Sequence, residues 1–175
     1  MHQFDATSAE CAVFTRKEGL LSAVAHDLQI AVTRFQIDVD ADARTVDARF
    51  DARSLRVQHA LQDGAPSPGA LTDEQKREIE GSIVRHVLKA DAHPEVRFVS
   101  TLVVDEGDGF RVRGALTLTG TTKSVDVVVR REDGRFVATA RLHQPDFGIR
   151  PYSALLGALK VKADVEVRVS VSAPA

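Results

Sequence analysis

The stretch Val161-Lys-Ala-Asp-Val-Glu-Val-Arg-Val-Ser-Val171 is the clearest structural signal in the chain. Every second residue in it is valine or alanine, and the residues between are charged or hydroxylated. Successive side chains of a β-strand point to opposite faces, so this alternation predicts one strand with an apolar and a solvated face. A slip of one residue would turn the charges inward, so the register of this strand is strongly specified.

The same period of two recurs along most of the chain. It covers residues 28–32, 35–39, 46–52, 96–104, 112–118, 125–129 and 136–142. Within 96–104 we expect one face to carry Val96, Phe98, Ser100, Leu102 and Val104. The short segments 105–109, 120–123 and 132–134 contain glycine and are typical of hairpin turns. Hairpins with one apolar face predict an antiparallel sheet of eight or nine strands, which curls into a closed barrel to bury that face.

One segment has the pattern of a strong helix. Residues 72–89 begin with a capping box of Thr72 and Gln75, and the apolar residues share one stripe. We expect this amphipathic helix to plug or flank the barrel. The apolar stretch 19–25 is too short for more than one or two helical turns, and the connection 58–94 is an excursion within a single domain that spans residues 1–175.

Composition narrows the class of protein. The 175 residues are 43% hydrophobic and 27% charged, which is typical of a globular domain, and the net charge of -2 gives no reason to expect a nucleic-acid partner. The N-terminus has no signal-peptide pattern and no segment is long enough to cross a bilayer as a helix. We therefore expect a cytoplasmic protein without stable membrane insertion. The single cysteine, Cys11, is expected to be a buried apolar residue.

The sequence contains few groups with the spacing that chemistry needs. None of its six histidines pairs with another at a metal-ligand spacing, and no nucleophile motif is present, so we predict no cofactor, no metal and no catalytic residues. His26-Asp27 is the most suggestive polar pair. One interpretation makes His26 a structural histidine that caps backbone groups, and the other places it at the barrel mouth against a ligand head group.

Several ordered motifs resemble those of the YceI-like family, the lipocalin-like polyisoprenoid-binding domains. They are His26-Asp-Leu28, Ser54-Leu55, His93-Pro-Glu-Val-Arg-Phe-Val-Ser100, Arg113-Gly-Ala-Leu-Thr-Leu-Thr-Gly-Thr-Thr-Lys123 and Asp146-Phe-Gly-Ile149. The resemblance spans about residues 9–172. It implies an eight-stranded, lipocalin-like antiparallel barrel with a helix between two strands, a cavity for a long apolar ligand such as a polyprenyl chain, and a possible homodimer.

The sequence leads to a first hypothesis of non-enzymatic binding or carriage of an isoprenoid or other long-chain lipid. Small residues expected to face inward leave room for such a ligand: Ala48, Ala52, Gly114, Ala138, Ala140 and Ala163. If larger side chains fill that room, no cavity exists. The expected ligand-binding residues are His26, Phe50, Phe98, Leu116, Leu118, Phe136, Ala138 and Phe147. The alternatives are an enzyme that acts on a small apolar substrate with His26 as acid or base, and a stress-related interaction protein without a ligand.

Overall fold

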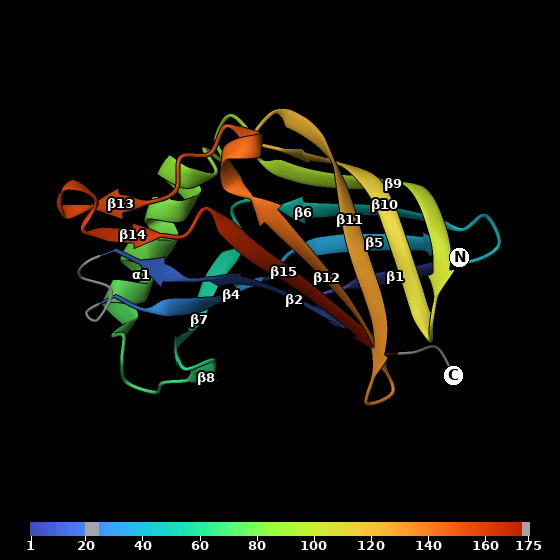
Figure 1. Cartoon of the computed structure of the whole chain (residues 1–175), viewed down its shortest axis with the longest axis horizontal. Coiled ribbons are helices and arrows are strands. Elements are labelled where there is room, and N and C mark those ends of the chain that lie inside the picture. The colour runs from blue at the N-terminus through green and yellow to red at the C-terminus, as the bar shows by residue number, and fades with distance from the viewer. Residues whose placement is uncertain (20–24, 173–175) are drawn as a thin grey trace.

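The computed structural model describes residues 1–19 and 25–172. Within them the chain is mostly β-structure with one main helix (Figure 1). The strands of the large sheet are β1 (His2–Asp5), β2 (Ala9–Thr15), β4 (Asp27–Val32), β5 (Phe35–Asp40), β6 (Thr45–Asp51), β7 (Leu55–Gln62), β8 (Ala65–Pro66), β9 (Glu95–Glu106), β10 (Gly109–Leu118), β11 (Thr121–Glu132), β12 (Arg135–His143) and β15 (Asp164–Ser172). A small second sheet contains β3 (Lys17–Glu18), β13 (Ser153–Ala154) and β14 (Leu159–Val161).

The large sheet is a curled half-barrel. Its twelve strands follow the order β1-β5-β6-β9-β10-β11-β12-β15-β2-β4-β7-β8, and every pairing in it is antiparallel. The predicted antiparallel sheet is confirmed. The predicted number of eight strands and the predicted closure are wrong, because the described residues form twelve strands in this sheet alone, and its hydrogen-bonded order ends at β1 on one side and β8 on the other.

Bends in the first third of the chain account for the larger number of strands. The chain turns between β4 and β5 and again between β6 and β7, so each half of a long extended run pairs with different neighbours. Ser54, only 1% exposed, joins the two bends. Its carbonyl accepts the Thr33 amide at 3.1 Å, and its hydroxyl accepts the Arg34 amide at 3.1 Å. These bonds satisfy backbone groups at the bends that have no partner in a neighbouring strand, so the bends leave few backbone groups without a hydrogen bond.

A β-bulge changes which face of β9 looks inward. Arg113 of β10 pairs with Leu102, but the next residue, Gly114, pairs with Ser100, which leaves Thr101 as an extra residue. The prediction that one face carries residues 96, 98, 100, 102 and 104 is therefore wrong beyond the bulge. Leu102 is 52% exposed on the outside, while Val103 lines the interior.

The C-terminal run is also divided. The alternation predicts one strand over residues 161–171, but β14 ends at Val161 and β15 begins at Asp164. The backbone between them has other partners: the Lys162 amide donates to the Arg16 carbonyl at 2.8 Å, and the Ala163 carbonyl accepts the Gln144 amide at 2.8 Å. From Asp164 onward the strand pairs with β12 and β2 as its alternation predicts.

The helix begins where the sequence predicts. Helix α1 (Asp73–Ser82) continues into a π-helical turn, η2 (Ile83–Val87), and the Thr72–Gln75 capping box is formed. The helix packs against β7 at one end of the half-barrel, where the Glu80 carboxylate accepts the Val57 amide at 2.8 Å (Figure 1). Most of the stretch 19–25 lies outside the described residues. None of the described helices is long and apolar enough to span a membrane.

Candidate functional site: a hydrophobic cavity

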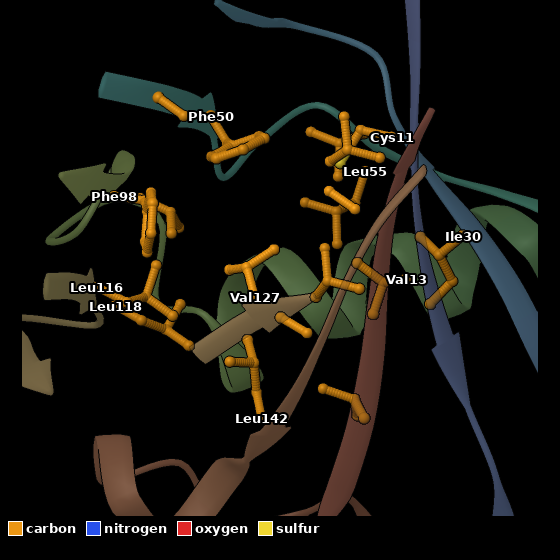
Figure 2. Close-up of a pocket in the computed structure, with 18 of the residues that line it drawn as sticks. Cys11, Val13, Ile30, Phe50, Leu55, Phe98, Leu116, Leu118, Val127 and Leu142 are labelled. Atoms are coloured by element: carbon orange, nitrogen blue, oxygen red, sulfur yellow. The ribbon is translucent and has the colours of Figure 1, made fainter. Parts of the chain in front are cut away.

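The half-barrel encloses a cavity of about 940 Å³. This volume is at the upper end of the range of small-molecule pockets, about 300–1,000 Å³. Figure 2 shows apolar side chains from many strands that surround the space, with α1 behind it. The labelled ones are Cys11, Val13, Ile30, Phe50, Leu55, Phe98, Leu116, Leu118, Val127 and Leu142.

The inward faces of the C-terminal strands show that this space is not filled by the protein's own side chains. Valines of β11 and β15 line the cavity but are only half-buried: Val125, Val127, Val129, Val165, Val167, Val169 and Val171. Ala138 and Ala140 of β12 lie between these two strands and are half-buried as well. Protein interiors contain few voids larger than a water molecule, so a continuous half-buried apolar lining indicates room for a ligand.

The small residues expected to create this room do not all do so. Ala48, Ala52, Ala138 and Ala140 line the cavity. Gly114 does not add space, because the ring of Phe98 occupies the position that a β-carbon at 114 would take. Ala163 lies in the break before β15 and is outside the lining. The expectation is therefore wrong for Gly114 and Ala163.

Seven of the eight residues expected to bind a ligand lie in the cavity lining. They are His26, Phe50, Phe98, Leu116, Leu118, Phe136 and Ala138. Phe147 does not line the cavity. It ends the 3-10 helix η3 (Gln144–Phe147), is 2% exposed, and its carbonyl accepts the Thr119 hydroxyl at 2.7 Å. The helical turn of η3 directs Phe147 into the packed core instead of along a strand face.

Most of the cavity lining is apolar, and two groups of its polar residues lie at opposite ends of the cavity (Figure 1). Near α1 the lining includes Lys17, His26, Glu78, Tyr152 and Lys160. Near β1 and the β5–β6 hairpin it includes His2, Asp40, Arg44 and Thr45. Figure 1 places these two groups of elements at opposite ends of the molecule's longest axis. This distribution suits a long molecule with an apolar body and a polar end.

The His26-Asp27 pair does not act as a unit. The Asp27 carboxylate accepts the Lys17 amide at 2.7 Å, and the Lys17 ammonium donates to the Ala25 carbonyl at 3.2 Å. Asp27 therefore fixes the backbone where β2 passes into β3. His26 is exposed and lies at the α1 end of the cavity, a position that matches the barrel-mouth interpretation.

The described part of the lining offers little reactive chemistry. No group of three or more His, Cys, Asp or Glu side chains among the described residues could hold a metal ion. Cys11 lines the cavity and is 4% exposed. Burial raises the pKa of the Cys11 thiol to about 12, so the thiol is neutral near pH 7 and is a weak nucleophile.

A curled antiparallel sheet around an apolar cavity is an architecture found among proteins that bind hydrophobic ligands. The family model described as the YceI-like domain matches residues 3–173, and the chain belongs to that family. The YceI-like fold is a binding-protein fold for polyisoprenoids and other hydrophobic ligands.

Two solved structures show the same fold. Burkholderia cenocepacia BcnA has a TM-score of 0.63 at 15% sequence identity, over 97% of this chain and 99% of BcnA. The YCEI protein of Campylobacter jejuni has a TM-score of 0.50 at 16% identity, over 78% of this chain and 77% of its own. Curated protein sequences give no match to this chain.

Proposed function

We propose that this protein binds or carries a hydrophobic or amphiphilic ligand, an isoprenoid or another long-chain lipid, without changing it chemically. The observation that carries the proposal is the cavity of about 940 Å³ with its half-buried apolar lining. Each methylene group buried there contributes about 0.8 kcal/mol, so about ten of them contribute about 8 kcal/mol, which corresponds to micromolar affinity before ordering costs are subtracted. A longer prenyl chain would offset those costs.

The proposed contacts follow from the position of each side chain. The rings of Phe50, Phe98 and Phe136 line the apolar part of the cavity and would contact the hydrocarbon. Leu116, Leu118 and Ala138 line the same part, each on a strand face that points inward. His26, at the α1 end, would meet the polar head group of an amphiphile.

The other two hypotheses lack a comparable observation. An acid–base role for His26 requires a second group that converges on the same reacting atom, and Asp27 is instead hydrogen-bonded to the Lys17 amide. An interaction protein without a ligand has no need of a half-buried apolar interior, which leaves hydrophobic surface without contacts.

A cavity-filling variant tests the proposal. Ala138→Phe places a ring in the empty space, whereas Ala12→Phe adds the same ring at a half-buried residue of β2 that does not line the cavity. Binding of N-phenyl-1-naphthylamine, a fluorescent apolar probe, and its displacement by a long-chain prenol are measured by titration. We expect Ala138→Phe to weaken probe binding at least tenfold and Ala12→Phe to leave it unchanged. Equal affinity in all three proteins would show that the probe binds elsewhere.

A further inference from the structure

A short hairpin at the α1 end of the cavity has features that binding alone does not explain. We call residues 150–162 the mouth hairpin. It contains β13 and β14, joined by the turn η4 (Leu155–Gly157), and β14 pairs with β3. In Figure 1 the β13–β14 turn projects from the molecule at the end that carries α1. Tyr152, Leu159, Lys160 and Val161 of this hairpin line the cavity.

Leu156, at the tip of the mouth hairpin, is fully exposed, with a relative accessibility of 109%. Its backbone has φ 55° and ψ 33°, the left-handed conformation, which is unfavourable for a residue with a β-carbon. Tyr152 on the same hairpin is 48% exposed. An exposed leucine in a strained conformation is unfavourable for the isolated protein, so its presence points to a partner that covers it.

The charge of the mouth hairpin indicates the kind of partner. It contains Arg150, Lys160 and Lys162 and no acidic residue, although the whole chain has 23 basic and 25 acidic residues. Among the described residues none of these three forms an ion pair, whereas arginines of the barrel wall do, for example Arg97 with Asp47. Glu18 of β3, opposite Lys160, is the nearest acidic residue in the small sheet. The mouth hairpin therefore has an apolar tip, and the charged residues on either side of that tip are basic.

The mouth hairpin is held in a fixed position at the cavity entrance. The Lys162 amide donates to the Arg16 carbonyl at 2.8 Å, which joins the hairpin to the residue before β3. Within the hairpin, the Val161 amide donates to the Tyr152 carbonyl at 3.0 Å. Gly19 lies so close to the turn that a β-carbon there would be 2.5 Å from the Ala158 carbonyl oxygen. The apolar tip and the cavity entrance therefore lie at the same end of the molecule, where one partner can contact both.

We propose that the mouth hairpin docks the cavity entrance reversibly on the surface of an anionic lipid bilayer. Leu156 and Tyr152 enter the head-group region, and Arg150, Lys160 and Lys162 attract the lipid phosphates. Apolar burial combined with cationic attraction is the way peripheral segments bind such surfaces, and tyrosine is enriched at that depth. The inference rests on the proposed function, since a lipid ligand that enters from a docked entrance avoids transfer through water.

Co-sedimentation with vesicles tests the docking. Two vesicle types are compared: phosphatidylcholine alone, and equal parts of phosphatidylcholine and phosphatidylglycerol. Leu156→Asn keeps a residue that tolerates the left-handed conformation but removes the apolar tip. Leu102→Asn is the matched control, because Leu102 is exposed on the outer face of β9. Arg150→Gln with Lys162→Gln removes two positive charges from the hairpin at residues that do not line the cavity. The matched control, Arg131→Gln with Arg141→Gln, removes two positive charges from exposed residues outside the hairpin.

We expect the wild-type protein to bind the anionic vesicles and not the neutral ones. Leu156→Asn should weaken this binding at least tenfold, and the Arg150/Lys162 variant should weaken it by about fivefold per charge removed. Both control variants should bind like the wild type. Absence of vesicle binding by the wild type would overturn the docking proposal, and so would Leu156→Asn binding as tightly as the wild type. If the wild type binds no vesicles but captures another protein, the partner of the mouth hairpin is a protein instead.

A solution assay separates this inference from the proposed function. N-phenyl-1-naphthylamine, added without vesicles, should bind Leu156→Asn as tightly as it binds the wild type, since Leu156 does not line the cavity. If vesicle binding fails while probe binding persists, only the docking proposal is wrong. If the cavity takes up no probe while the hairpin still binds vesicles, the proposed function is wrong.

Discussion

The ring of Phe98 in β9 lies against the backbone of Gly114 in β10, in the place of the side chain that Gly114 lacks. A β-carbon at position 114 would overlap the ring and would also lie 2.6 Å from the Val99 carbonyl oxygen. Phe98 is cross-strand partner to Leu116, so the ring lies over its neighbouring strand and forms part of the cavity wall. The absence of a side chain at position 114 thus shapes this wall.

Gly114→Ala is expected to destabilise the protein. The added methyl group collides with a ring and with backbone, neither of which moves easily, so overpacking should lower the free energy of unfolding by about 1–3 kcal/mol. Gly81→Ala in α1 is the matched control, since its β-carbon meets only the end of the flexible Arg85 side chain and alanine is favoured by up to about 1 kcal/mol in a helix. Urea denaturation measures both. A Gly114→Ala protein as stable as the wild type would contradict the placement of Phe98.

Several features of the fold follow directly from the sequence. The β9–β10 and β11–β12 hairpin turns, the helix cap at Thr72 and the inward face of β15 lie where local pattern and turn chemistry predict them. These features depend on neighbouring residues, which is why they can be predicted. The turn predicted at 120–123 lies at Thr119–Gly120 instead, and residues 121–123 belong to β11. The number of strands depends on long-range bonds such as Thr33 to Ser54, which no local pattern records.

The cavity was predicted less completely than the fold. Alternation identifies the inward residues of β10 and β12, including Leu116, Leu118, Phe136 and Ala138, but not whether the space between them is filled. The period-two pattern does not predict β1, β2 or β7 as strands. In β2 the residues from Ala12 to Phe14 are apolar on both faces, so the period of two is lost. A homodimer, a cytoplasmic location and the absence of a nucleic-acid partner stay predictions.

Asp51, at the bend after β6, makes the stability of the protein depend on pH. Burial raises the pKa of Asp51, but hydrogen bonds from the Arg53 amide at 2.7 Å and the Arg34 side chain at 2.9 Å outweigh burial and hold the pKa below its usual 3.8. A lowered pKa in the folded state stabilises the protein above pH 3.8, and this contribution is lost as the pH falls through the folded-state value.

We therefore expect Asp51→Asn to be less stable than the wild type at pH 7 and to approach it in stability as the pH falls below 3.8. Thermal unfolding of both proteins over a series of pH values measures the difference. A difference that is constant with pH would show that the Asp51 charge does not support the bend.

Cys11 reports on access to the cavity. Because burial raises the pKa of the Cys11 thiol to about 12, we expect N-ethylmaleimide to react at pH 8 on the order of a hundredfold to a thousandfold more slowly than with an ordinary cysteine. The urea-unfolded chain should react at the ordinary rate. Intact-mass measurement follows the reaction, and rapid labelling of the folded protein would place Cys11 outside a buried lining.

The central claim is that the cavity of about 940 Å³ holds a hydrophobic ligand. Native mass spectrometry of the protein purified from its own host, followed by extraction and identification of any bound lipid, tests this claim most directly. The account predicts a mass above that of the 19.0 kDa chain, with a long-chain apolar molecule in the extract and a reduced load on Ala138→Phe. A protein that repeatedly shows only the mass of the bare chain and takes up no added long-chain lipid would contradict it.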